Sequence, residues 1–597
     1  MVNPTRLFDF PQHQLENNPL EVSICSMVDG KWKSYSSQEY IDHANWISYG
    51  LMKMGVKPGD KIGLISHNNR CEWNIMDIGS TQIGAVDVPV YANMSEDDYN
   101  YVLNHAEVKY VFVSNQDLYD KVAAVKSKVP SIVEVFSFEK LANVKHWLEV
   151  LELGKSVEKE NPGIKEELQR IKDGISKDDL ATLIYTSGTT GLPKGVMLSH
   201  WNLVSNSLYS APKMPNITIE NPKSLSFLPV CHVFERMLQY LYSYTGVSIY
   251  FAQSIETIKE DLNYVQPQMF AAVPRLLEKF FDGIVAKGTA AGGVKSKLFA
   301  WAVALALEWE PNGANGGMYE FKLKLARKLV FSKVKAALGM TGIEAVVSGG
   351  AALQPRLARF FNGAGITVLE GYGLTETSPV ITVNTVYNNG IRIGTVGRLI
   401  DNNFVKIAED GEILTKGPNV MQGYYKEPEK TAEVMTGEWF HTGDIGMVDD
   451  DGFLKITDRK KQMFKTSGGK YIAPQPIENG MKESHLIEQA MVIGDGKKFP
   501  AALIVAFEDG MKEWAKRHDI KVSTYSEMIT NEEIIGKMER DINKINERLG
   551  KWEQIKKFKI VPEPFSVEGG ELTPTMKLRR KPILKKYGYL VDEIYDC

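Results

Sequence analysis

Hydroxyl, glycine and lysine residues gather between Tyr185 and Gly195 in a pattern suited to holding a polyphosphate. Glycine lets backbone N–H groups approach an anion closely, hydroxyls donate to phosphate oxygens, and lysine supplies a positive charge. The segment is not a Walker A loop, because Pro193 precedes the lysine and Gly195 follows it. The candidate phosphate ligands are Thr186, Ser187, Gly188, Thr189, Thr190 and Lys194.

Two more clusters of small and polar residues follow predicted strands at 344–348 and 365–369. Sheets of α/β proteins bind ligands just beyond such strand ends. Tyr372 offers a flat surface to a nucleotide base, and Glu376 offers a hard oxygen to Mg²⁺. The candidate nucleotide ligands are Gly350, Ala351, Glu370, Gly371, Tyr372, Gly373 and Thr375, and Glu376 is the candidate metal ligand.

Later in the chain, two charged residues have the chemistry to hold a nucleotide sugar. Asp444 can accept hydrogen bonds from both hydroxyls of a ribose, and Arg459 can reach ribose or phosphate. Two further residues are ambiguous when taken alone. A lone histidine such as His232 is more often a satisfied core residue, and a lysine such as Lys577 in a loop of Gly, Pro and Thr is usually solvent-exposed.

The elements that must position these residues alternate between strand and helix patterns. Strands are predicted at 61–66, 85–89, 108–114 and 180–185, with helices at 40–54 and 73–84 between them. This alternation predicts an α/β fold of layered, mostly parallel sheets covered by helices. Residues 151–178 are charged and are interpreted as a polar connector. From residue 390 onward, short strands separated by glycine turns predict a small antiparallel β subdomain.

Composition narrows the class of protein. The chain has 597 residues, which is too many for one core, and its net charge of −4 gives no reason to expect nucleic acid. Its four cysteines show no metal-binding spacing and suit a reducing compartment. The N-terminus has no secretory pattern, and no apolar run reaches the length of about 18 residues that a membrane span needs. We therefore expect a cytoplasmic protein.

Residues 283–340 combine a helical apolar pattern with many lysines. The simpler interpretation is a solvated helix packed on the core, since Leu323, Ala326 and Val330 share one face. The alternative is a basic amphipathic surface that faces anionic lipid. Peripheral membrane contact therefore stays open at this point, as does a homodimer.

Taken together and in this order, the motifs resemble those of the adenylate-forming superfamily, which includes acyl-CoA synthetases, luciferases and peptide-synthetase adenylation domains. The stretch from Gly437 to Lys461 is similar to the signature of fatty acyl-CoA synthetases, and the segment around His232 resembles that of the long-chain enzymes. The resemblance implies a large N-terminal domain at 1–460, with the small β subdomain at 390–458. It also implies a hinge at Lys461 and a smaller, mobile α+β lid domain at 462–597.

The resemblance further implies roles for particular residues. Lys577 is the expected catalytic lysine, assisted by Glu376 and Thr186, and it also contacts the nucleotide. His232 is expected to border the carboxylate and acyl site. The expected route for coenzyme A passes the loop that contains Lys465, Ser467, Gly468 and Gly469.

These features predict a ligase that uses ATP and Mg²⁺ to convert a fatty acid to acyl-AMP and then acyl-CoA. The resemblance to the long-chain enzymes implies that the fatty acid has a long chain. One alternative is a ligase that delivers the acyl group to an acyl carrier protein. Such enzymes tend to carry an insertion after the hinge, whereas Lys461 here runs directly into Met463. The alternative from another class is an inactive lipid-binding pseudoenzyme, which the presence of Lys577, Glu376 and Asp444 disfavours.

Overall fold

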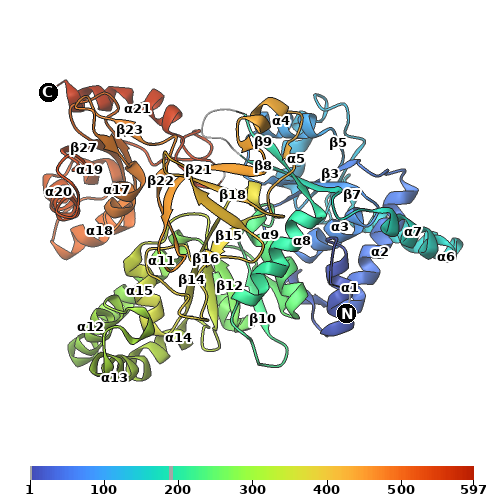
Figure 1. Ribbon diagram of the computed structural model, residues 1–597, viewed down its shortest axis with the longest axis horizontal. Coiled ribbons are helices and arrows are strands. Elements are labelled where there is room, and N and C mark those ends of the chain that lie inside the picture. The colour runs from blue at the N-terminus through green and yellow to red at the C-terminus, as the bar shows by residue number, and fades with distance from the viewer. Residues whose placement is uncertain (1–2, 187–191, 574, 597) are drawn as a thin grey trace.

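The computed structural model describes residues 3–186, 192–573 and 575–596 (Figure 1). Its N-terminal part contains an eight-stranded sheet in the order β19-β9-β8-β4-β3-β5-β6-β7. All neighbours in this sheet are parallel except those that involve β9 and β19. The strands are β3 (Lys61–Ser66), β4 (Val86–Tyr91), β5 (Val108–Val113), β6 (Glu134–Ser137), β7 (Lys145–His146), β8 (Leu180–Thr186), β9 (Lys194–Ser199) and β19 (Gly423–Tyr424).

A second sheet has nine strands in the order β16-β15-β14-β13-β12-β10-β11-β1-β2. Its central strands are parallel, and antiparallel strands close both edges. The strands are β1 (Ile24–Val28), β2 (Lys31–Tyr35), β10 (Lys223–Ser226), β11 (Ser248–Phe251), β12 (Met269–Ala272), β13 (Ala345–Ser348), β14 (Val368–Gly373), β15 (Val380–Val383) and β16 (Arg398–Leu399).

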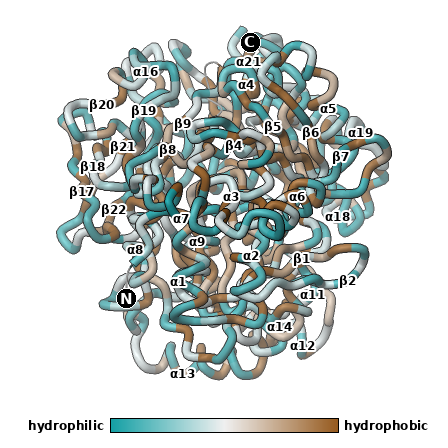
Figure 2. The backbone as a smooth tube through the Cα atoms, turned by 90° about the vertical axis from the view of Figure 1, so that its right-hand side faces the viewer, coloured by the Kyte–Doolittle hydropathy of each residue, from teal (hydrophilic) through white to brown (hydrophobic). Residues whose placement is uncertain are grey.

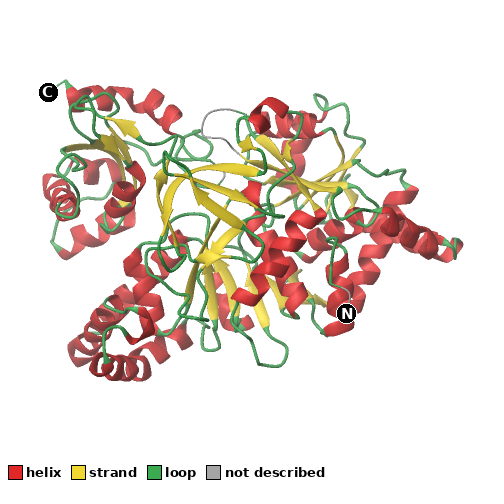
Figure 3. Ribbon diagram, in the orientation of Figure 1, coloured by secondary structure: helices red, strands yellow, loops and turns green. Residues whose placement is uncertain are grey.

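Helices fill the space between and around the two sheets (Figure 3). One core cluster joins both sheets to α3 (Cys71–Thr81), α8 (His200–Ser210) and α9 (Val233–Thr245). Every residue of α3 is buried, as expected for a helix packed on all sides. The other helices of this part are α1 (Asp9–Asn17), α2 (Ser37–Lys53), α4 (Glu96–Ala106), α5 (Gln116–Lys126), α10 (Ile258–Val265), α11 (Pro274–Ala290), α12 (Gly293–Leu307) and α15 (Pro355–Ala364).

The prediction of a polar connector at 151–178 is wrong. The segment lies mostly within two helices, α6 (Trp147–Glu160) and α7 (Ile164–Gly174). Charged residues cover their outer sides, but Trp147, Val150 and Leu151 are buried in the core. An added Cβ at Gly154 would lie 1.8 Å from the backbone oxygen of Trp46, so the glycine allows α6 to pack closely on α2.

A five-stranded antiparallel sheet follows, built from β17 (Phe404–Ile407), β18 (Glu412–Lys416), β20 (Met435–Thr436), β21 (Trp439–Val448) and β22 (Leu454–Arg459). The C-terminal residues fold at one end of the molecule (Figure 1). They form β23 (Phe464–Lys465), β24 (Tyr471–Ile472), α17 (Pro474–Met481), β25 (Ile487–Ile493), β26 (Ala501–Ala506), α18 (Glu508–Arg517), α19 (Tyr525–Thr530), α20 (Glu532–Asn546), β27 (Lys557–Ile560) and α21 (Arg580–Tyr595). The predicted fold class is confirmed, whereas the domain boundaries and the mobility of the lid stay predictions.

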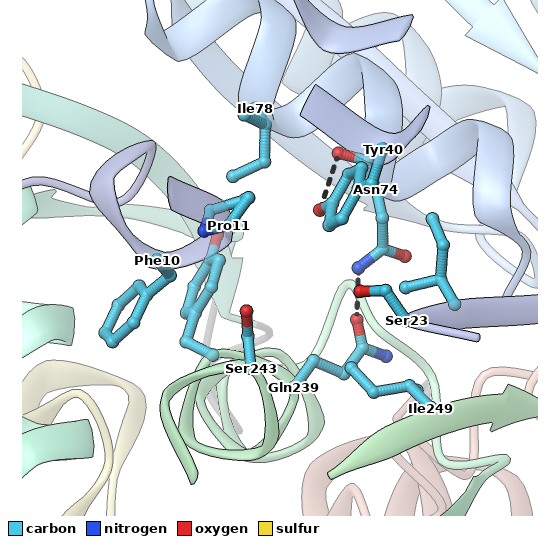
Figure 4. Close-up of a pocket in the computed structure, with 11 residues that line it drawn as sticks. Phe10, Pro11, Ser23, Tyr40, Asn74, Ile78, Gln239, Ser243 and Ile249 are labelled. Atoms are coloured by element: carbon cyan, nitrogen blue, oxygen red, sulfur yellow. Dashed lines mark hydrogen bonds between the residues drawn. The ribbon is translucent and has the colours of Figure 1, made fainter. Parts of the chain in front are cut away.

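Hydrophobic segments run through the interior and also reach the outer edge near α12 and α13 (Gly317–Ala326) (Figure 2). Among the described residues, no helix is both long enough and apolar enough to cross a membrane. A cavity of about 10 Å³ lies between α1, α3 and α9, where Asn74, Gln239 and Ser243 contribute polar groups (Figure 4). This volume holds about one water molecule, so the cavity cannot be the substrate site.

Candidate active site

Three strands bring Tyr372, Asp444 and Arg459 together. Asp444 on β21 and Arg459 on β22 are paired across the antiparallel ladder, so their side chains are neighbours. The Arg459 Nε donates to Asp444 Oδ1 at 2.9 Å, and the Tyr372 hydroxyl donates to Asp444 Oδ2 at 2.7 Å. Asp444 is buried, yet a carboxylate has about four acceptor positions, and the described residues make one bond to each of its oxygens. The aspartate can therefore still accept ribose hydroxyls.

The backbone at Tyr372 differs from the predicted loop. The sequence placed residues 370–373 just past a strand, but β14 continues to Gly373 and pairs with the antiparallel β15. The close approach of the two strands requires glycine, because a Cβ at Gly373 would lie 1.7 Å from the Pro379 oxygen. Glu370 and Gly371 therefore belong to the sheet, and Thr375 begins the short helix η4 (Thr375–Thr377) after it.

A second group of residues surrounds Glu376, at the centre of η4. The Tyr424 hydroxyl donates to Glu376 Oε1 at 2.9 Å, and the Lys194 ammonium lies 3.8 Å from the centre of the Tyr424 ring. Burial lowers the pKa of Lys194, the nearby charge of Lys461 lowers it further, and Glu376 opposes the shift. The predicted metal ligand, the predicted phosphate lysine and the predicted hinge residue therefore lie close together.

The predicted phosphate loop is only partly described. Thr186 ends β8, and it is paired in register with Lys194 at the start of β9. These two candidates therefore flank the loop on neighbouring strands. The other predicted ligands of this loop lie outside the described residues: Ser187, Gly188, Thr189 and Thr190.

Lys577 lies beside both groups, although it is more than 100 residues from them in the sequence. Dense surrounding protein, with Arg459 as the second cause, lowers the pKa of Lys577 to about 8, while Asp444 and Glu376 act in the opposite direction. The lysine keeps solvent access, so its ammonium can still meet a ligand. Its backbone is fixed at both ends, because Thr573 N donates to the Lys577 oxygen at 2.8 Å and Lys577 N donates to Thr573 Oγ1 at 3.0 Å.

His232 caps the start of α9, where its Nδ1 accepts from Phe234 N at 3.2 Å. Burial and the positive charge of Lys577 lower the pKa of His232 to about 4, so the ring is neutral at pH 7. Since Nδ1 accepts a hydrogen bond, the proton belongs on Nε2, which is then free to donate. His232 is therefore a neutral donor near Lys577 rather than a positive charge.

The predicted loop after β13 borders the same region. A Cβ at Gly349 would come within 3.2 Å of the Phe234 ring, which places this loop against the start of α9. Gly350 has a φ of +80°, and Ala351 beside it is exposed. Glu370 is buried and accepts from Leu353 N at 3.0 Å. Burial raises the pKa of Glu370 to about 8, so this carboxyl is largely protonated at pH 7 and supports the loop.

The predicted coenzyme A loop lies at the tip of the β23–β24 hairpin. Lys465, Ser467, Gly468 and Gly469 are exposed there. The backbone holds the loop, because Ser467 N donates to the Lys497 oxygen and Gly496 N donates to the Lys465 oxygen, both at 2.8 Å. These backbone partners lie in the C-terminal part of the chain, which also carries Lys577. The role of the loop stays a prediction.

A metal ion bound by protein alone is not expected here. Within the described ranges, no group of three histidine, cysteine, aspartate or glutamate residues could hold one. Mg²⁺ usually binds through one or two carboxylates together with substrate phosphates and water. The single carboxylate of Glu376, with Thr186 and Lys194 nearby for phosphates, fits that pattern.

Two features of the site were not predicted from the sequence. Tyr424 contacts both Glu376 and Lys194, but it stands in an unremarkable Gly-Tyr-Tyr segment that carries no motif. Arg236 is completely buried and donates to Asp77 at 2.5 Å, to Asp87 at 3.2 Å and to Thr182 at 2.8 Å. We call Arg236, Asp77, Asp87, Thr182 and Tyr240 the closed network.

The closed network ties together the elements that lead into the site. Thr182 lies on β8, four residues before Thr186, and Arg236 lies on α9, four residues after His232. The carboxylates come from α3 and β4. The network therefore fixes the start of the predicted phosphate loop relative to His232.

Known proteins are similar to this chain over nearly its whole length. The AMP-binding enzyme family matches residues 11–425, and the AMP-binding enzyme C-terminal domain matches residues 461–597. A long-chain-fatty-acid–CoA ligase of Mycobacterium bovis, FadD15, is 35% identical over 585 residues, covering 97% of this chain and 95% of the relative. The Xenopus laevis ligase ACSBG2 is 31% identical and covers 96% of this chain and 82% of the relative.

Solved structures show the same fold. The adenylation domain of a carboxylic acid reductase from Segniliparus rugosus, in complex with AMP and a carboxylic acid, superposes with a TM-score of 0.74 at 19% identity, covering 99% of this chain and 94% of that one. The o-succinylbenzoate–CoA synthetase of Bacillus subtilis, in complex with ATP and magnesium, gives 0.65 at 20% identity, covering 96% and 98%. Together with the sequence matches, this establishes that the chain belongs to the AMP-binding enzyme family.

Proposed function

We propose that this chain is an ATP-dependent fatty acid–CoA ligase that forms acyl-AMP, releases pyrophosphate and then transfers the acyl group to coenzyme A. The observation that carries the proposal is the meeting of Lys577 with Asp444, Arg459 and Glu376. It joins a mobile positive charge to candidate groups for a ribose and for a metal. Relatives that span nearly the whole chain are named long-chain-fatty-acid–CoA ligases, which supports a long-chain acid as substrate.

The first step needs positive charge more than it needs acid–base chemistry. The carboxylate attacks the α-phosphorus of ATP, and pyrophosphate leaves with the electrons of the broken bond. Negative charge grows on the phosphoryl oxygens, where the Lys577 ammonium can neutralise it. Bound at Glu376, Mg²⁺ would add charge neutralisation for the phosphates. Lys194 and Thr186 supply further contacts to the departing pyrophosphate.

The remaining residues orient the reactants. Asp444 holds the ribose, with its two oxygens fixed by Tyr372 and Arg459. His232 donates from Nε2 to the substrate carboxylate, and its neutral ring leaves that carboxylate its nucleophilic charge. In the second step, the thiol of coenzyme A attacks the acyl carbonyl and AMP leaves. We propose that, before this second step, the lid turns about Lys461, removes Lys577 and presents the Lys465–Gly469 loop to the thiol.

The proposal is tested by measuring AMP release with ATP and Mg²⁺ across acids from acetate to oleate, with and without coenzyme A. We expect turnover that depends on coenzyme A and is highest for long chains. AMP formation that is indifferent to coenzyme A would favour the ligase for a carrier protein. An absence of AMP with every acid would reject fatty acid activation.

A further inference from the structure

A helical segment at the edge of the molecule has apolar residues on two opposite faces. It comprises α13 (Gly317–Ala326), the π-helical turn η3 (Arg327–Phe331) and α14 (Ser332–Ala337), with no break between them. Together with α12 it projects at one end of the structure (Figure 1). On the inner face, Leu323, Ala326 and Phe331 are buried. This inner face accounts for the helical apolar pattern that the sequence shows.

The outer face carries a second apolar row. Met318, Phe321, Leu325 and Leu329 follow one another at spacings of three, four and four residues, which places them on one side of a helix. Met318 is 71% exposed, Phe321 68%, Leu325 42% and Leu329 40%. A helix on the surface of a globular protein normally turns polar residues outward. Contiguous exposed apolar residues of this kind mark a binding surface.

Four exposed lysines accompany this outer row: Lys322, Lys324, Lys328 and Lys333. None of their ammonium groups makes an ion pair or hydrogen bond with any residue that the structure describes. The other two cations of the segment are engaged inward, where Arg327 donates to the oxygens of Asn362 and Gly363, and Lys335 donates to that of Gly365. Glu320 is the one acidic residue between Gly317 and Ala337.

The neighbouring helix α12 extends the same chemistry. It packs against α13, and its first turn exposes Val294 to 82% together with Lys295 and Lys297. The surface therefore combines exposed apolar side chains with lysines whose charges are unmatched by the protein.

The charges decide between two partners for this surface. A second copy of the chain, docked through the same face about a two-fold axis, would bring these lysines against their own equivalents. Lipid phosphates would neutralise them instead, and each lysine close to an anionic membrane contributes favourably. We propose that the outer apolar row and its lysines bind an anionic membrane surface, with the helix lying in the plane of the interface.

This inference deepens the proposed function and rests on it in one respect only. A long-chain acid is concentrated in membranes, so an enzyme bound there meets its substrate where it resides. The binding surface itself is argued from exposure and charge alone.

The test is sedimentation with phosphatidylcholine vesicles prepared with and without phosphatidylglycerol. The intact chain should bind only when phosphatidylglycerol is present. Two changes at exposed positions, Phe321→Ser with Leu325→Ser, should weaken binding about tenfold or more. Changing Lys322, Lys324, Lys328 and Lys333 together to glutamate should weaken it about a hundredfold or more.

The matched control changes four lysines of the lid to glutamate, and it alters net charge by the same amount. These residues are exposed and also lack ion pairs with the described part of the chain: Lys516, Lys521, Lys544 and Lys551. The control variant should bind vesicles like the intact chain. Equal binding by all variants, or loss in the control as well, would overturn the proposal.

Two further measurements separate this inference from its rivals. A concentration-dependent dimer that forms without vesicles and disappears in the Phe321→Ser, Leu325→Ser variant would overturn it and assign the surface to a second copy. AMP formation from octanoate, a soluble acid, should be the same in the surface variants and in the intact chain. Vesicle binding without any fatty acid activation would reject the proposed function and leave the membrane surface standing.

Discussion

Two groups of charged residues in this molecule, the closed network and the cluster around Asp444, contain similar residues but differ in whether the protein itself neutralises their charges. In the closed network, Arg236 lies between Asp77 and Asp87 with almost no exposure to solvent. We call Asp444, Arg459, Tyr372, Glu376 and Lys577 the open cluster. Arg459 and Asp444 are also paired there, but Lys577 makes no ion pair with the described residues and keeps solvent access.

The difference lies in what completes each set of charges. Each of the three guanidinium nitrogens of Arg236 donates a hydrogen bond to the protein, and the Tyr240 hydroxyl donates to Asp77 at 2.6 Å. The charged groups near Lys577 shift its pKa, but none of the described ones forms an ion pair with it. A buried network whose charges are all paired within the protein stabilises the fold, whereas a cluster that contains an unpaired charge is suited to bind a charged ligand.

The largest effect on stability is expected from Arg236→Met. Removal of the cation leaves Asp77 and Asp87 buried without their partner, which costs about 3–5 kcal/mol. The pKa of Asp87 is already raised by burial and by Asp77, so the loss of Arg236 would raise it further. Chemical unfolding followed by fluorescence should show an earlier first transition.

A combined variant sharpens this interpretation. Adding Asp77→Asn and Asp87→Asn to Arg236→Met removes both unpaired charges, so part of the lost stability should return. If the triple variant is no more stable than Arg236→Met alone, packing rather than unpaired charge holds this region together.

Lys577→Ala should have the opposite profile. The lysine is exposed on its loop, so the unfolding transition should move little, while adenylate formation from acid and ATP should fall by about 10²–10³-fold. Thioester formation from supplied acyl adenylate should be largely spared, because in the proposed mechanism Lys577 has left the site by then. Equal loss in both half-reactions would contradict the assigned role.

The pH dependence of the first step should report the same lysine. Lys577 acts as an ammonium, and its pKa is lowered to about 8, so kcat/KM for adenylation should be constant below that pH and fall about tenfold per unit above it. In Lys577→Arg, the guanidinium stays charged and the alkaline limb should move upward. If the limb stays near pH 8 in that variant, ionisation of Glu370, whose pKa is also raised to about 8, becomes its cause.

The sequence predicted the open cluster far better than the closed network. Asp444, Tyr372 and Glu376 stand in runs of glycine, threonine and aromatic residues, which have few purposes other than ligand binding. Arg236 carries no such mark, because a buried arginine becomes recognisable only when Asp77 and Asp87 arrive from distant elements. Tertiary packing also explains the missed helices α6 and α7, whose apolar stripe is narrow and whose outer faces are highly charged.

The smallest effect is expected at Tyr424, a residue of the ligand site whose hydrogen bond resembles one in the closed network. It is a neutral residue that fixes Glu376 by one hydrogen bond, as Tyr240 fixes Asp77 in the closed network. In Tyr424→Phe the ring beneath Lys194 remains, and only that bond is lost, at a cost of about 1 kcal/mol.

If Tyr424 positions the metal ligand, the concentration of Mg²⁺ needed for half-maximal adenylation should rise about fivefold, with little change in the unfolding transition. Tyr425→Phe is the matched control, since the neighbouring ring packs edge-on against His105 and no hydrogen bond to Glu376 is described for it. An unchanged Mg²⁺ requirement with reduced stability would place Tyr424 with the structural residues instead. The position of Glu376 would then be set by its backbone alone, and its side chain would become ordered only when the substrate binds.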